Sequence, residues 1–120
     1  MKASFLMTAL FQASIMAVMS GVATNASAGG DLANGRMLAQ GSQCTHCHGV
    51  DGNARSTSLQ AIPMLAGQPA AYLVEQMKNY AEGIRTSSTK NFDLMVKELR
   101  LLGESDFADL AVYYEAQKRY

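Results

Sequence analysis

One pentapeptide, Cys44-Thr45-His46-Cys47-His48, constrains this chain more than any other stretch. It contains both cysteines and both histidines of the 120 residues, so the strong thiol and metal-binding side chains occupy five consecutive positions. The Cys-x-x-Cys-His pattern is typical of covalent haem attachment. Two intervening residues let one helical turn present both thiols to two vinyl groups, and His48 then lies beneath the iron as its proximal ligand. The motif therefore predicts one haem c held by Cys44 and Cys47.

Three other uses of the motif fit the sequence less well. A structural zinc site normally takes four ligands from two separated pairs, and the chain has no second pair of cysteines or histidines. A thioredoxin-like dithiol needs strands alternating with helices, and the sequence shows no strand pattern. A disulfide between Cys44 and Cys47 would close a loop of a few residues and stabilise the fold very little. Haem attachment is the favoured interpretation.

The first 28 residues have the pattern of a secretory signal peptide. Lys2 gives a positive start, the run from Phe5 to Val22 is largely apolar, and Ala26-Ser27-Ala28 is a small-x-small cleavage site. Cleavage there would leave residues 29–120 as one mature domain. The alternative is an uncleaved membrane anchor, because the apolar run approaches spanning length, but polar residues within it favour cleavage. We therefore predict a periplasmic protein with no stable membrane insertion after cleavage.

Charge and periodicity indicate a small helical domain. Ten Lys and Arg balance ten Asp and Glu, which gives no argument for binding nucleic acid or an anionic membrane. A mature chain this short cannot build a large core alone, and a haem would supply an apolar centre. Because no stretch alternates like a strand, we predict an all-α fold of three to five helices with long loops wrapped around one covalently bound haem.

Apolar residues at helical spacing locate four helices outside the motif. Gly35 lies inside the first, where glycine costs about 1 kcal/mol relative to alanine. The sequence alone leaves two explanations open for it, simple tolerance and the close approach of another element. The predicted helices run from Asp31, as cap, to about Gln43, from Pro69, in the first turn, to Gly83, from Asp93 to Leu101, and from Gly103 onward.

A single proximal histidine leaves the other side of the iron to be filled. His46 lies between the cysteines and cannot reach that side, and no further histidine exists in the chain. A methionine is expected there, because its neutral thioether favours ferrous iron. Met37 and Met77 fall on helical faces that favour core packing. Met95 is therefore the first candidate and Met64 the second.

Further segments of the mature chain share the pattern of one family. They are Cys44-Thr45-His46-Cys47-His48-Gly49, Asp51-Gly52-Asn53, Pro63-Met64-Leu65-Ala66-Gly67-Gln68, Tyr72-Leu73, Gln76, Tyr80, Gly83, Arg85, Asp106-Phe107-Ala108-Asp109-Leu110-Ala111 and Tyr113-Tyr114. On these segments the chain resembles class I bacterial cytochromes c, especially small one-haem forms and single halves of two-haem forms. The haem motif is shared by many cytochromes, whereas the Leu-Ala-Gly-Gln run and the last-helix pattern are more specific.

The resemblance implies a role for each of five residues. Cys44 and Cys47 would hold the haem, and His48 would bind its iron. The carbonyl of Pro63 would accept a hydrogen bond from the ring of His48 and fix its orientation. Met95 would be the second axial ligand, so that the metal ligands are His48 and Met95.

The resemblance also carries expectations for the fold and the function. Gly35 would mark the crossing of the first and last helices, with Phe107 or the C-terminal tyrosines packed over it. The function would be one-electron transfer between redox protein partners, a carrier rather than an enzyme. The alternatives are a haem subunit of a larger oxidoreductase complex and a five-coordinate haem that binds gases or reacts with peroxide.

Overall fold

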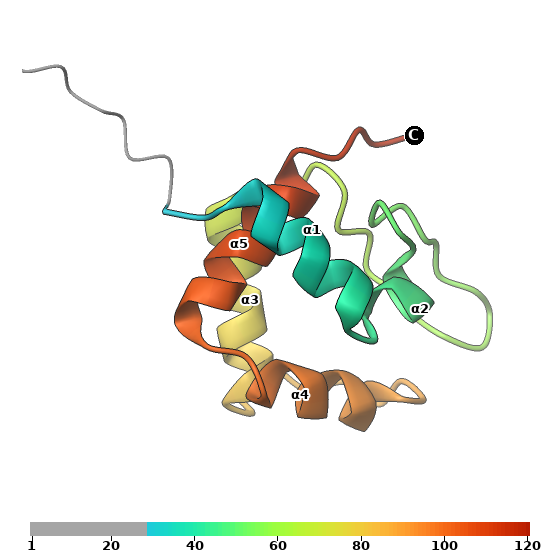
Figure 1. Ribbon diagram of the computed structural model, residues 1–120. Coiled ribbons are helices and arrows are strands. Elements are labelled where there is room, and N and C mark those ends of the chain that lie inside the picture. The colour runs from blue at the N-terminus through green and yellow to red at the C-terminus, as the bar shows by residue number, and fades with distance from the viewer. Residues whose placement is uncertain (1–28) are drawn as a thin grey trace, which may run out of the picture.

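The computed structural model describes residues 29–120, and the predicted signal peptide at 1–28 lies outside the described residues. Within 29–120 the chain forms five helices and no strand, which confirms the all-α prediction (Figure 1). Of the helices described, none is long and apolar enough to cross a membrane. The helices are α1 Leu32–Gly41, α2 Cys44–His48, α3 Ala70–Ala81, α4 Phe92–Arg100 and α5 Glu104–Glu115.

The local signals at the helix ends act largely as predicted. The Asp31 carboxylate caps α1 by accepting hydrogen bonds from the backbone N–H groups of Ala33 and Asn34, at 2.8 and 3.0 Å. Gly83, with a φ of +76°, turns the chain away after α3. Pro69 differs from the prediction, because it precedes the first helical residue of α3 instead of occupying that position. Helix boundaries of this kind commonly differ by one residue.

Helices α1 and α5 cross at Gly35. A side-chain carbon at this position would overlap the backbone carbonyl of Asp109 and the Cβ of Tyr113. Gly30, just before α1, lies equally close to the carbonyl of Ala108. The glycines therefore let two backbones touch, and close approach is the correct explanation for Gly35. Tyr113, one of the expected tyrosines, packs there.

A buried carboxylate fastens the start of α1 to α5. Asp109 accepts a hydrogen bond from the Asp31 backbone N–H at 2.6 Å and another from Asn34 Nδ2 at 2.7 Å. The bond from Asn34, followed by that from Asp31, holds the pKa of Asp109 below its ordinary value. Both bonds join residues more than seventy positions apart, so they fix the tertiary arrangement of the two helices.

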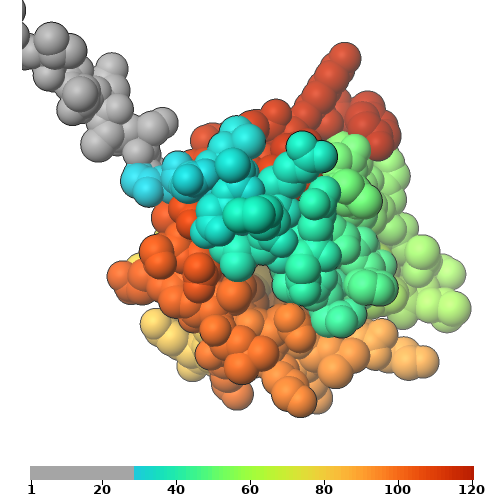
Figure 2. Space-filling view, in the orientation of Figure 1, coloured from blue at the N-terminus to red at the C-terminus, as the bar shows by residue number. Residues whose placement is uncertain are grey.

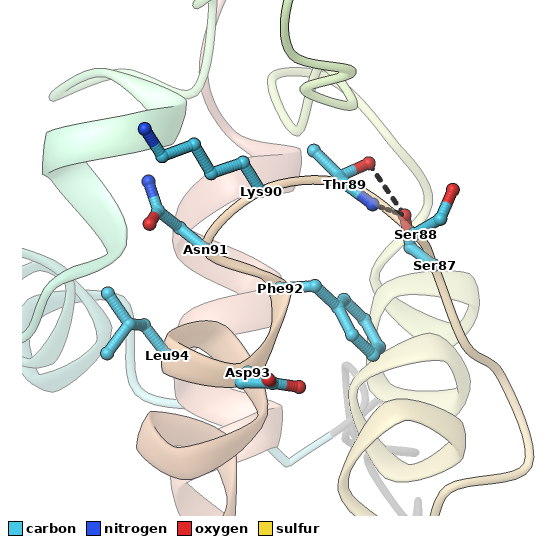
Figure 3. A pocket seen from close by; sticks show the side chains of 8 residues that line it. All are labelled: Ser87, Ser88, Thr89, Lys90, Asn91, Phe92, Asp93 and Leu94. Carbon is cyan, nitrogen blue, oxygen red and sulfur yellow. Dashed lines mark hydrogen bonds between the residues drawn. The ribbon is translucent and has the colours of Figure 1, made fainter.

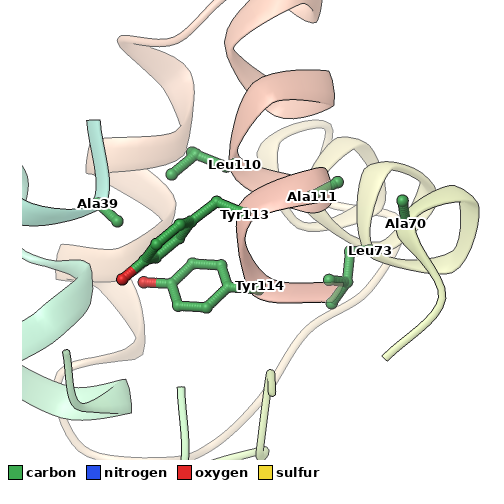
Figure 4. Packing of buried hydrophobic residues seen from close by; sticks show 7 residues of the cluster. All are labelled: Ala39, Ala70, Leu73, Leu110, Ala111, Tyr113 and Tyr114. Carbon is green, nitrogen blue, oxygen red and sulfur yellow. The ribbon is translucent and has the colours of Figure 1, made fainter. Parts of the chain in front are cut away.

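The core lies between α1, α3 and α5, and α2 and α4 each pack at its edge. The packed helix pairs are α1 with α5 and α2, and α3 with α5 and α4. The pair of α2 with α4 is not among these packed pairs of the described residues, and Figure 2 shows a dent between the surface of α1 and α2 and that of α4. The buried cluster around α5 consists of Ala39, Ala70, Leu73, Leu110, Ala111, Tyr113 and Tyr114 (Figure 4).

Candidate functional site

Helix α2 is a single short helix that presents both cysteines. Cys44 and Cys47 are three residues apart, so they share one face of the turn, and they are not joined to each other. Gly49, with a φ of +81°, ends the helix directly after His48, and its N–H donates to the carbonyl of Thr45 at 3.0 Å. Both thiols therefore remain available to the same partner.

The Pro63 carbonyl holds the imidazole of His48. The carbonyl oxygen lies 2.9 Å from Nδ1, which must donate because a carbonyl only accepts, so Nε2 keeps its lone pair for a metal. Burial lowers the pKa of His48 and the bond to Pro63 opposes this, so the neutral, metal-binding form is favoured. The loop after Pro63 is fixed in turn, because the N–H groups of Leu65 and Ala66 donate to the carbonyl of Gly52 at 2.9 and 3.1 Å.

Two residues that influence Cys44 were not identified from the sequence. The Ser42 hydroxyl donates to Cys44 Sγ at 2.9 Å. Burial raises the pKa of the Cys44 thiol, the bond from Ser42 opposes the rise, and the negative charge of Glu98 adds to it. Glu98 belongs to α4, so its charge acts on Cys44 from a helix outside the motif. Only the short separation of Ser42 from Cys44 was a signal in the sequence.

The four methionines of the described chain occupy different environments. Met95 is half-buried on α4 and precedes Glu98 by three residues, so the two share one face of the helix. Met64 directly follows the carbonyl that holds the imidazole. Met77 is half-buried against the core, as expected, whereas core packing is wrong for Met37, which is 64% exposed on α1. Met64 therefore lies next to the group that orients His48, whereas Met95 lies on a different element, α4.

Two hollows in the surface lie beside α4, away from the thiols. One, of about 600 Å³, is lined by residues 87–94, and the Ser87 and Thr89 hydroxyls there are hydrogen-bonded to each other at 2.7 Å (Figure 3). The other, of about 460 Å³, lies between α3, the following loop and α4, with Tyr80 and Phe92 in edge-to-face contact. Neither hollow is lined by a cysteine or by His48. The site is therefore defined by its donor groups rather than by these hollows.

The residues of the site fit a covalently attached haem. Two thiols lie one helical turn apart, beside an imidazole whose outer nitrogen is left for iron. The Tyr114 hydroxyl is buried and has no hydrogen-bond partner within residues 29–120. Helices α2 and α4 each pack on a different neighbour, so an apolar plate between them would complete the core.

Comparison with known families identifies the domain. Residues 32–115 match the family model of cytochrome c. This chain belongs to the cytochrome c family. The family is one of electron carriers rather than enzymes, and with Cys44 and Cys47 membership implies one covalently bound haem c.

Individual relatives confirm the resemblance to class I cytochromes c. The chain is 39% identical over 93 residues to cytochrome c4 of Pseudomonas aeruginosa, covering 78% of this chain and 41% of that protein. It is 37% identical over 75 residues to cytochrome c-554(548) of Halomonas halodenitrificans, covering 62% and 84%. The crystal structure of reduced cytochrome c4 from Pseudomonas stutzeri superposes with a TM-score of 0.59 at 30% identity, covering 76% and 47%. The chain thus spans about half the length of the cytochrome c4 relatives and most of c-554(548).

Proposed function

We propose that this chain is a periplasmic one-electron carrier in which His48 and Met95 bind the haem iron from opposite sides. When bound, haem c supplies a reversible Fe(III)/Fe(II) couple. The observation that carries the proposal is the 2.9 Å contact between His48 Nδ1 and the Pro63 carbonyl, which points Nε2 outward as a ligand. The family assignment supports electron transfer, and the ligand set is the finer part of the proposal.

Cys44, Cys47 and Pro63 position the iron ligands. Two thioether bonds would fix the haem to α2, so that its orientation does not depend on packing alone. The Pro63 carbonyl restricts rotation of the His48 ring and raises its basicity as a ligand. Each of these contacts would limit movement of the ligands when the charge of the iron changes, which would keep the reorganisation on electron transfer small.

Met95 would close the second face of the iron. A thioether ligand favours the ferrous state and raises the reduction potential. With both axial positions filled by the chain, no position would remain for a gas or a peroxide, so the ligand set favours a carrier over a five-coordinate haem protein. Electrons would then pass through the haem edge to redox protein partners, a donor and an acceptor.

The periplasmic location is proposed from the N-terminal sequence. Residues 1–28 have the charge, apolar run and cleavage box of a secretory signal. Bacteria attach c-type haem outside the cytoplasmic membrane, so export and the Cys-x-x-Cys-His motif agree. N-terminal sequencing of the exported protein should begin at Gly29.

A matched pair of substitutions tests the ligand set. Met95→Leu and Met64→Leu each replace a thioether with a side chain of similar volume, so packing changes little. The ferric protein should show the weak far-red absorption band of an iron–methionine bond, and this band should be lost in Met95→Leu and kept in Met64→Leu. A band that survives in Met95→Leu would refute the assignment of Met95, and its loss in Met64→Leu alone would transfer the role to Met64.

A further inference from the structure

Two neighbouring tyrosines of α5 differ in their hydrogen bonding. Tyr113 donates its hydroxyl to the backbone carbonyl of Val50 at 2.7 Å. Tyr114 is only 4% exposed, and its hydroxyl meets no acceptor in the part of the chain that the structure describes. The rings lie edge to face with centroids 5.0 Å apart, and both side chains are buried, so the two differ chiefly in whether the hydroxyl has a partner. A buried hydroxyl without a partner costs folding free energy, so the one on Tyr114 requires an explanation.

The Tyr114 hydroxyl faces the part of the core that leads to Cys44. Figure 4 shows the hydroxyls of both tyrosines pointing away from Leu73, toward the side where Ala39 of α1 lies. The Ser42 hydroxyl, which donates to Cys44 Sγ, also contacts the carbonyl of Ala39, at 3.5 Å. Burial raises the pKa of Tyr114, and the charge of Cys44 is the next cause, which agrees with this placement.

Gly52 packs closely against the Tyr114 ring and leaves no room for a side chain at its own position. A side-chain carbon at Gly52 would lie 2.8 Å from the Tyr114 ring and 2.9 Å from the backbone nitrogen of Ala66. Gly52 also accepts the hydrogen bonds that hold the loop after Pro63. The Tyr114 ring is therefore fixed between α1 and this loop, and its hydroxyl cannot turn away to solvent.

We propose that Tyr114 is a haem-facing hydrogen-bond donor that raises the reduction potential of the attached haem. Its O–H would point at the haem edge next to the Cys44 thioether, where the sulfur and the π face are weak acceptors. The positive end of the O–H dipole favours the ferrous state, which carries one positive charge less than the ferric state. Tyr114 would thus act on the haem through its O–H dipole and would not bind the iron. The inference rests on haem attachment and is independent of which methionine binds the iron.

Tyr114→Phe tests the inference, with Tyr113→Phe as the matched control. Each change removes one oxygen atom and keeps the ring. In a spectroelectrochemical titration of the purified holoproteins, the midpoint potential should fall in Tyr114→Phe and stay at the wild-type value in Tyr113→Phe. An unchanged potential in Tyr114→Phe, or an equal fall in both variants, would overturn the proposal.

Proton NMR of the unaltered ferrous protein provides a test that needs no variant. The Tyr114 ring protons should give nuclear Overhauser contacts to the haem substituents beside the Cys44 thioether. Absence of these contacts would overturn the proposal even if Tyr114→Phe failed to mature. Failure of the Met95→Leu experiment would leave both results unaffected, so the two proposals are tested separately.

Discussion

The α1–α5 crossing and the region between α2 and α4 are built in opposite ways. At the crossing, Gly35 lets two backbones touch, and Asp109 fastens the start of α1 with two hydrogen bonds. Helices α2 and α4, by contrast, pack on different neighbours, α2 on α1 and α4 on α3. The polypeptide alone therefore specifies the α1–α5 crossing, whereas an additional group is needed to join α2 to α4.

This difference assigns separate tasks to the two regions. The crossing is a rigid frame whose geometry is set by glycine backbone contact and buried polar groups. The other region brings together the thiol pair and the imidazole of the haem-attachment motif. Changes at the crossing should therefore alter stability and leave the haem spectrum as it is, while changes at α2 should alter both.

The largest effect is expected from removing both thiols. In Cys44→Ser/Cys47→Ser the haem is no longer covalently held, and the domain loses the group that fills the space between α2 and α4. Because a domain of this size has little core of its own, cooperative thermal unfolding should be lost. Circular dichroism at 222 nm measures this, with single Cys47→Ser as a control that keeps one thioether. Cooperative unfolding of the haem-free double variant at the wild-type temperature would contradict the comparison.

A smaller effect is expected from forcing the crossing apart. Gly35→Val would place side-chain carbons on the Asp109 carbonyl, and overpacking of this kind typically costs about 1–3 kcal/mol. Chemical denaturation should show this loss while the visible spectrum stays unchanged. The control is Gly41→Ala, because a side-chain carbon at Gly41 meets nothing within 4 Å. That variant should be neutral or up to about 1 kcal/mol more stable, from helix propensity.

The contrast between the two regions would be weakened if Gly35→Val kept its stability or changed its visible spectrum. Gly35→Val with wild-type stability would show that the helices move apart freely. A lost far-red band in Gly35→Val would show that the crossing also sets the ligand geometry.

The smallest loss of stability is expected from Asp109→Asn, and its size should depend on pH. The pKa of Asp109 in the folded protein lies below the ordinary value of 3.8, because Asn34 and the Asp31 backbone donate to it. The unfolded chain therefore binds the proton more readily, so the contribution to stability is complete above about pH 3.8 and is lost as the pH falls through the lowered pKa. Asp109→Asn should be less stable than wild type at pH 7, and the difference should shrink below pH 3.8.

Urea unfolding of both proteins from pH 7 downward measures this difference. Asp51 and Glu104 also have lowered pKa values, and both remain in Asp109→Asn, so subtracting the two curves isolates Asp109. A stability difference that stays constant through the acid range would show that the carboxylate charge is not what fastens α1.

Most of the secondary structure and the thiol–imidazole motif could be predicted from local sequence. The Asp31 cap and the left-handed Gly83 are signals read over a few residues, and both act as expected. The His48–Pro63 contact came only from the family resemblance, because fifteen residues separate the partners. Periodicity gives no distance across a loop of that length.

Other features of the site have no local signal. The bonds of Asp109 join residues 75 and 78 positions apart, and the sequence offers no pattern for them. For Gly35, the residues alone left tolerance and close approach open, and only the packed structure decides. Tyr114 falls on the apolar face of its helix, and only the three-dimensional structure shows that its hydroxyl has no hydrogen-bond partner within residues 29–120.

The most direct test of the account is the mass of the purified, exported wild-type protein under denaturing conditions. Denaturant removes every non-covalent ligand, so only a haem bound through Cys44 and Cys47 would remain on the chain. We expect the mass of residues 29–120 plus one haem. The mass of the polypeptide alone, from cells that attach haem to another c-type cytochrome, would contradict it.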